Sequence, residues 1–118
     1  MVLLFKPEHV QPILSGLKTQ TRMVWKKPRV KVGGIYKAKT KLFSKDYFAL
    51  LRVTRLRKER LGDISPEDAQ AEGGYSIEQF KRIWKEINGS WDPEQEVWVV
   101  EFEMLDQARC NKAGDRGK

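Results

Sequence analysis

Residues 96–104 carry the sequence feature that most restricts the fold of this chain. Apolar side chains occupy every second position there, which is the period of a strand that packs one side on a core. These positions are Trp98, Val100, Phe102 and Met104. Other strand patterns cover residues 2–5, 35–42 and 48–56. With 118 residues and neither a repeat nor a linker, the chain is expected to form one domain.

Helix signals lie around these strands. Ser65 precedes a first-turn proline and two acidic residues, and Ser76 with Gln79 forms a capping-box pattern. A helix is predicted after each of these two serines, and apolar residues recur at helical spacing in the second one. A further helix is expected within residues 7–17, kinked or begun late because Pro12 removes a helical hydrogen bond.

The order of these elements predicts the fold class. Strands interrupted by a pair of helices indicate an α+β protein, and we expect a small mixed β-barrel with helices packed around it. The domain should span residues 1–105. Residues 106–118 are polar and contain glycine, so they are predicted to be a mobile tail.

The segment Gly16-Leu17-Lys18-Thr19-Gln20-Thr21-Arg22 is unusually dense in hydrogen-bond donors. Side chains of these types contribute little to an apolar core, so the segment is interpreted as a surface for a polar ligand. A second candidate is the lone carboxylate of Glu72, within Ala69-Gln70-Ala71-Glu72-Gly73.

In these segments the chain resembles the ASCH domain family. The matching stretches are residues 13–22, 32–36, 69–73 and 97–102. The resemblance implies a β-barrel similar to the PUA domain, a module that binds RNA. Small bacterial members that look like this chain hydrolyse N4-acetylcytidine to cytidine and acetate, without a cofactor. Their catalytic lysine, threonine and glutamate correspond here to Lys18, Thr21 and Glu72.

Six further residues are predicted to bind the substrate: Thr19, Gln20, Arg22, Lys26, Lys27 and Arg29. Two departures from the family pattern bear on substrate choice. Many members carry an arginine where this chain has Met23, and this chain has a basic insert around residues 26–29.

The chemistry of amide hydrolysis assigns a role to each catalytic candidate. The Thr21 hydroxyl would attack the carbonyl carbon or position a water that does so. Lys18 would be the base if burial or a nearby cation lowers its pKa. Glu72 would carry a proton to the departing cytosine amine. Lys18 and Thr21 would face opposite ways on a flat strand, so their convergence requires a turn after Gly16.

Other interpretations remain open at the level of sequence. If each residue is considered singly, Lys18 is interpreted as a solvated lysine, Thr21 as a strand threonine and Glu72 as a helix-end acid. An RNA-binding module would use the same cleft with the basic insert, and aromatic residues would stack on bases. These aromatic candidates are Trp25, Tyr47 and Trp91. A protein-interaction domain is a third alternative, which no sequence feature favours.

The residue composition limits which kinds of site, partner and location are expected for this chain. One histidine and one cysteine leave no conventional zinc ligand set, so no metal site is predicted. His9 is interpreted as a capping or surface residue, and Cys110 as an incidental thiol. The net charge of +7 favours an anionic partner such as RNA. No apolar run reaches the roughly 20 residues that cross a bilayer, and no signal peptide is seen, so a cytoplasmic protein is expected. No sequence feature determines the oligomeric state, and a monomer is the expectation.

Overall fold

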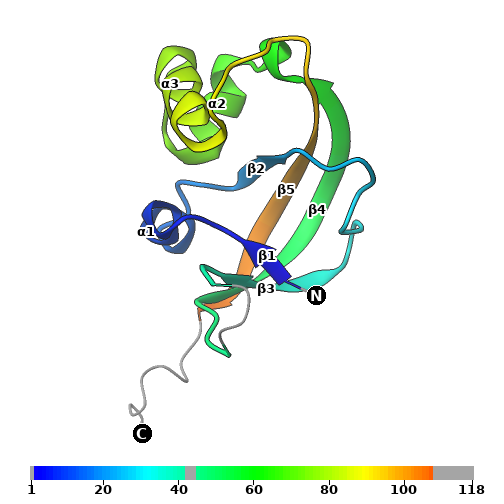
Figure 1. Ribbon diagram of the computed structural model, residues 1–118. Coiled ribbons are helices and arrows are strands. Elements are labelled where there is room, and N and C mark those ends of the chain that lie inside the picture. The colour runs from blue at the N-terminus through cyan, green and yellow to red at the C-terminus, as the bar shows by residue number, and fades with distance from the viewer. Residues whose placement is uncertain (1, 42–44, 108–118) are drawn as a thin grey trace, which may run out of the picture.

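The computed structural model describes residues 2–41 and 45–107. Five strands form one mixed sheet in the order β1-β3-β4-β5-β2, and helices cover part of it (Figure 1). The strands are β1 (Val2–Leu4), β2 (Gln20–Met23), β3 (Ile35–Lys39), β4 (Ala49–Arg60) and β5 (Glu96–Gln107). The helical elements are η1 (Pro7–His9), α1 (Val10–Leu14), η2 (Leu61–Asp63), α2 (Pro66–Gly73) and α3 (Ile77–Asn88). The predicted α+β class is confirmed.

The predicted closed barrel is not confirmed, because the sheet is open. The antiparallel strands β4 and β5 form a long ribbon, and the other strands attach to it at different levels. β3 pairs with β4 over residues 49–52, and β1 pairs only with β3. β2 pairs with β5 over residues 98–101, further along the ribbon. The two edge strands, β1 and β2, therefore do not meet.

Two apolar clusters pack against the ribbon. One contains Phe5, Val100 and Phe102, and the other lies beneath α2 and α3 and contains Phe80 and Val99. The neighbouring residues Val99 and Val100 are both buried, one in each cluster. The prediction that β5 buries a single side is therefore wrong, because the helices cover its other side near the start of the strand.

The helix ends follow the local sequence signals. The hydroxyl of Ser65 accepts a hydrogen bond from the backbone N–H of Asp68, and Ser76 with Gln79 forms a complete capping box. Both caps were predicted and are confirmed. Pro12 lies in the first turn of α1, where a backbone N–H has no intrahelical partner to lose. The helix therefore begins late, which was one of the two predicted alternatives.

The structure extends one predicted strand and adds a strand that the sequence did not predict. β5 continues to Gln107, where Asp106 and Gln107 still pair with β4. The rest of the predicted tail, including Cys110, lies outside the described residues. β2 was not assigned from the sequence. In residues 2–41 and 45–107, no helix has the length and apolar character needed to cross a membrane.

Candidate functional site

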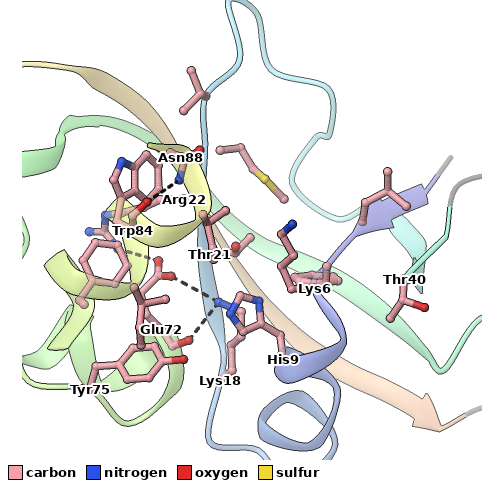
Figure 2. Close-up of a pocket in the computed structure, with 17 residues that line it drawn as sticks. Lys6, His9, Lys18, Thr21, Arg22, Thr40, Glu72, Tyr75, Trp84 and Asn88 are labelled. Carbon is pink, nitrogen blue, oxygen red and sulfur yellow. Dashed lines mark hydrogen bonds and ion pairs between the residues drawn. The ribbon is translucent and has the colours of Figure 1, made fainter. Parts of the chain in front are cut away.

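A cavity of about 370 Å³ lies beside β2, between the β1–α1 segment and α3 (Figure 2). The three predicted catalytic residues, Lys18, Thr21 and Glu72, all line it. The remaining wall is largely apolar and is formed in part by Leu4, Phe5, Val24, Phe80, Ile83, Trp84 and Ile87. Concave, mostly apolar sites with a few converging polar groups are typical of small-molecule binding.

Lys18 is the most unusual residue of the cavity, because only 2% of it is exposed. Its Nζ donates hydrogen bonds to the carbonyl oxygen of Gln20 (2.8 Å), the carbonyl oxygen of Glu72 (3.0 Å) and Glu72 Oε1 (3.3 Å). Burial lowers the pKa of Lys18 below the ordinary value of 10.5, and the charge of Arg22 lowers it further, against the opposing effect of Glu72. This is the shift that a lysine base needs.

The backbone around Lys18 explains how the side chain reaches the cavity. Gly16 has a φ of 84°, in the left-handed region, and the backbone N–H of Lys18 donates to the carbonyl of Pro12 (2.9 Å). The chain therefore turns before β2 begins at Gln20. Because Lys18 precedes the strand, the alternation rule does not separate it from Thr21. The turn predicted after Gly16 is confirmed.

Glu72 lies in the last turn of α2 and is 4% exposed. A carboxylate is disfavoured at a helix C-terminus, but here two cations contact it. Oε1 contacts Lys18, and Oε2 accepts a hydrogen bond from Nη1 of Arg22 (2.9 Å). The backbone N–H of Thr19 also donates to the carbonyl of Ala71 (2.8 Å). This hydrogen bond links α2 to the segment of residues 16–22.

Thr21 is buried on β2, opposite Val100 of β5. Within the described part of the chain its hydroxyl has no hydrogen-bond partner, although it lines the cavity (Figure 2). A hydroxyl that no protein acceptor occupies is available to a ligand or to a base. The sequence interpretation of Thr21 as a strand threonine and its interpretation as a cavity residue both apply.

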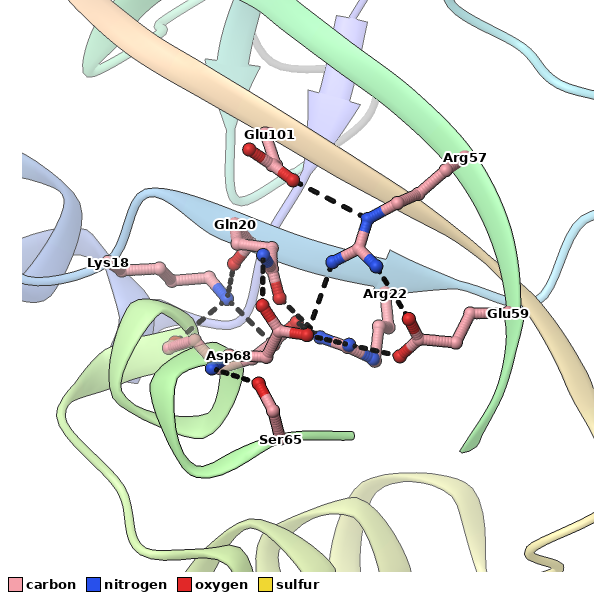
Figure 3. A network of polar contacts seen from close by, with 9 residues as sticks. Lys18, Gln20, Arg22, Arg57, Glu59, Ser65, Asp68 and Glu101 are labelled. Carbon is pink, nitrogen blue, oxygen red and sulfur yellow. Dashed lines mark hydrogen bonds and ion pairs between the residues drawn. The ribbon is translucent and has the colours of Figure 1, made fainter. Parts of the chain in front are cut away.

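The predicted substrate-binding residues divide into three groups. Gln20 and Arg22 are buried in a polar network behind the cavity, and Arg22 also forms part of its wall (Figure 3). Thr19 is exposed and contributes its backbone rather than its side chain. The structure does not bring the basic insert into the cavity: its cations are exposed on the connection between β2 and β3. These cations are Lys26, Lys27 and Arg29.

Comparison with known proteins bears on the fold. No protein-family model matches the sequence, and no curated protein matches it. Among solved structures, a protein from Enterococcus faecalis V583 described by the family model DUF984 superposes with a TM-score of 0.69 at 19% identity, over 94% of this chain and 75% of that chain. The ASCH domain from Lactobacillus crispatus JV V101 superposes with a TM-score of 0.59 at 15% identity, over 84% of this chain and 70% of that one.

ASCH from Zymomonas mobilis gives a TM-score of 0.59 at 12% identity, covering 99% of this chain and 81% of that chain. This chain has the ASCH fold. The resemblance predicted from the sequence motifs is therefore confirmed in the fold, by two solved structures of ASCH proteins.

Two cavity residues of this ASCH fold were missed by sequence reasoning. His9 makes no capping hydrogen bond with its side chain and instead lines the cavity, so its predicted capping role is wrong. Burial, with a smaller effect of Lys18, lowers the pKa of His9 from 6.5 to about 4, so the imidazole is neutral at pH 7. His9 and Lys18 line the same cavity, and the charge of Lys18 acts on the imidazole, an arrangement that the local sequence does not reveal.

Tyr75 also lines the cavity, directly after the glycine that ends α2. Burial raises the pKa of Tyr75, and the charges of Glu72 and Glu8 add to the effect. Its hydroxyl therefore remains a neutral donor. Its proximity to Glu72 in the sequence was the only signal available. In residues 2–41 and 45–107, no group of three or more His, Cys, Asp or Glu residues could hold a metal ion.

Proposed function

We propose that this chain hydrolyses the amide of N4-acetylcytidine to cytidine and acetate in the cavity. The observation that carries the proposal is the enclosure of Lys18, with its lowered pKa, in one cavity with Thr21 and Glu72. These are the residues that the motif resemblance identifies as catalytic. The cavity of about 370 Å³ is within the usual size range of small-molecule sites.

The chemistry begins once Lys18 has lost a proton: the neutral amine then donates to two of the three oxygen atoms around Nζ and keeps a lone pair for the Thr21 proton. Lys18 takes the proton of the Thr21 hydroxyl as the Thr21 oxygen attacks the acetyl carbon, so a C–O bond forms and Lys18 becomes an ammonium. Three oxygen acceptors surround Nζ and stabilise this ammonium. The tetrahedral oxyanion requires a hydrogen-bond donor, and the neutral Tyr75 hydroxyl in the cavity wall is available for that role.

The departing nitrogen then needs a proton. Glu72 Oε1 lies 3.3 Å from Lys18 Nζ and relays the proton from Lys18 to N4 as the C–N bond breaks. Cytidine leaves, and the acetyl group remains on Thr21. Water adds to this ester with Lys18 again as the base, and Lys18 passes the proton to the Thr21 oxygen as the C–O bond to Thr21 breaks. The acetic acid formed loses its proton to solvent and leaves as acetate. Each turnover therefore restores neutral Lys18 and ionised Glu72.

The experiment is chromatographic detection of cytidine released from N4-acetylcytidine by the purified protein. We expect turnover by the parent, and a fall of at least about a hundredfold in each of Lys18→Met, Thr21→Val and Glu72→Gln. Retained folding is checked by circular dichroism. A parent that releases no cytidine, or a Thr21→Val variant as active as the parent, would rule out this mechanism.

RNA binding is the second candidate function. It is favoured by the basic insert, whose three cations are exposed outside the cavity. In the part of the chain that the structure describes, none of Lys26, Lys27 and Arg29 forms an ion pair. Unpaired cations of this kind suit phosphate contacts. The two functions are compatible, because a modified cytidine within RNA would use both surfaces.

A further inference from the structure

Arg22 lies beneath the cavity and is almost completely enclosed, with 4% of the residue exposed. Its Nη1 donates to Glu72 Oε2 (2.9 Å) and to the side-chain oxygen of Gln20. Its Nη2 donates to Glu59 Oε2 (2.7 Å) and to Asp68 Oδ2 (3.3 Å) (Figure 3). One guanidinium thus contacts three carboxylates from β4 and α2.

This arrangement leaves Arg22 little capacity to hold a substrate. Both terminal nitrogens already have two acceptors each, and the remaining nitrogen, Nε, is buried without a partner. A ligand in the cavity would have to displace a buried carboxylate to reach the charge, at a high desolvation cost. The interpretation of Arg22 as a substrate-binding residue is therefore replaced by one in which it acts through Glu72.

Glu72 is held between two cations by different oxygens. Oε2 faces Arg22 and Oε1 faces Lys18, so the contact with Arg22 fixes which oxygen is presented to Lys18. We infer that Arg22 is a positioning residue for the proposed reaction: it orients the Glu72 carboxylate so that Oε1 faces Lys18, and it places a buried positive charge beside that pair. The inference rests on the proposed function for its consequence in catalysis, but not for its effect on Lys18.

The titratable groups that face Lys18 come from three elements. Glu72 on α2 favours the ammonium form, whereas Arg22 on β2 opposes it, and His9 on η1 is uncharged at pH 7. The loss of Arg22 would leave Glu59, Asp68 and Glu72 with one cation fewer among them. The pKa of Lys18 would then rise, because a neighbouring positive charge has gone and three negative charges are less compensated.

Arg57 provides a matched control within the same network. It contacts Glu59 (2.6 Å), Asp68 (3.2 Å) and Glu101 (3.5 Å), but it does not contact Glu72. Substitution of Arg57 therefore removes a cation from the cluster without releasing the Glu72 carboxylate. An effect specific to Arg22 separates positioning of Glu72 from a general weakening of the network.

The test is a ¹³C NMR titration of the Lys18 side chain in the ligand-free protein, for the parent, Arg22→Met and Arg57→Met. We expect a higher Lys18 pKa in Arg22→Met and a much smaller change in Arg57→Met. If Arg22→Met does not fold, Arg22→Met combined with Asp68→Asn restores the formal charge of the cluster, and a smaller rise in the same direction is expected because Glu72 is still released from Arg22. An unchanged Lys18 pKa in a folded Arg22 variant would overturn the inference.

Kinetics supply a second readout. In Arg22→Met, kcat/KM for N4-acetylcytidine is expected to fall at least about tenfold at pH 7 and to recover as the pH is raised, because more Lys18 becomes neutral. A raised KM with an unchanged pH profile would instead show that Arg22 binds the substrate. Because the NMR titration needs no substrate, it decides the role of Arg22 even if the parent shows no hydrolysis.

Discussion

At the scale of single residues, the site depends on the burial of groups that sequence alone presents as ordinary. The local sequence predicts a solvated side chain for a lysine between a leucine and a threonine. In the structure, Lys18 is buried and its pKa is lowered. The motif resemblance identified Lys18, Thr21 and Glu72, but not the depth at which they lie. Burial depends on contacts between residues about 50 positions apart, such as Lys18 with Glu72, which no local pattern contains.

His9 gives a prediction about stability and pH. Its pKa is about 4 in the folded protein and 6.5 in the unfolded chain, so the unfolded state takes up the proton first as the pH falls. Stability present above pH 6.5 is therefore lost towards pH 4. Urea unfolding should show that His9→Gln loses about 1–2 kcal/mol less than the parent over this window, an amount reduced because the imidazole is only partly buried. Parallel pH dependences would contradict this.

At the scale of elements, the short helix α2 determines the position of Glu72. The Ser65 cap begins the helix, and Gly74 ends it with a φ of 81°, a left-handed conformation that glycine adopts without strain. The sequence predicted the Ser65 cap and placed Glu72 at a helix end, and both predictions are confirmed. The close approach of Gly74 to Leu17 was not predicted from the sequence. A Cβ at Gly74 would lie 3.1 Å from the methyl carbons of Leu17.

Two glycine variants separate helix termination from its effect on the site. Gly74 and Gly89 both end a helix in the left-handed region, but a Cβ at Gly89 would meet no atom within 4 Å. Gly74→Ala and Gly89→Ala should each cost about 1 kcal/mol in thermal unfolding. Only Gly74→Ala should also lower turnover, because it pushes on Leu17 beside Lys18. Equal turnover in both variants would contradict the coupling.

At the scale of the whole molecule, the sequence predicted individual strands and helices better than it predicted whether the sheet closes into a barrel. The strands β3, β4 and β5 and the two capped helices follow from alternation and capping signals. The strand β2 was not predicted because three of its four residues are polar, although the structure buries all three. The open sheet was not predictable either, because it depends on where β1 and β2 attach along the β4–β5 ribbon.

The net charge of +7 leads to a prediction about salt. If RNA binds through the three cations of the basic insert, its affinity should fall about twentyfold between 50 and 200 mM salt. Turnover of free N4-acetylcytidine, which is uncharged, should change less than about twofold over the same range. Fluorescence anisotropy of a labelled single-stranded RNA measures the first quantity. The absence of binding at 50 mM salt would eliminate the RNA-binding candidate.

The most direct measurement of the central claim, that buried Lys18 is the base in this cavity, is the pH dependence of kcat/KM for N4-acetylcytidine. Because the reaction needs neutral Lys18, kcat/KM should rise with pH through a midpoint below 10.5, the ordinary lysine value. Lys18→Met should lack this rise. A parent without turnover, a profile with no rise, or a rise at the ordinary value of a solvated lysine would contradict the account.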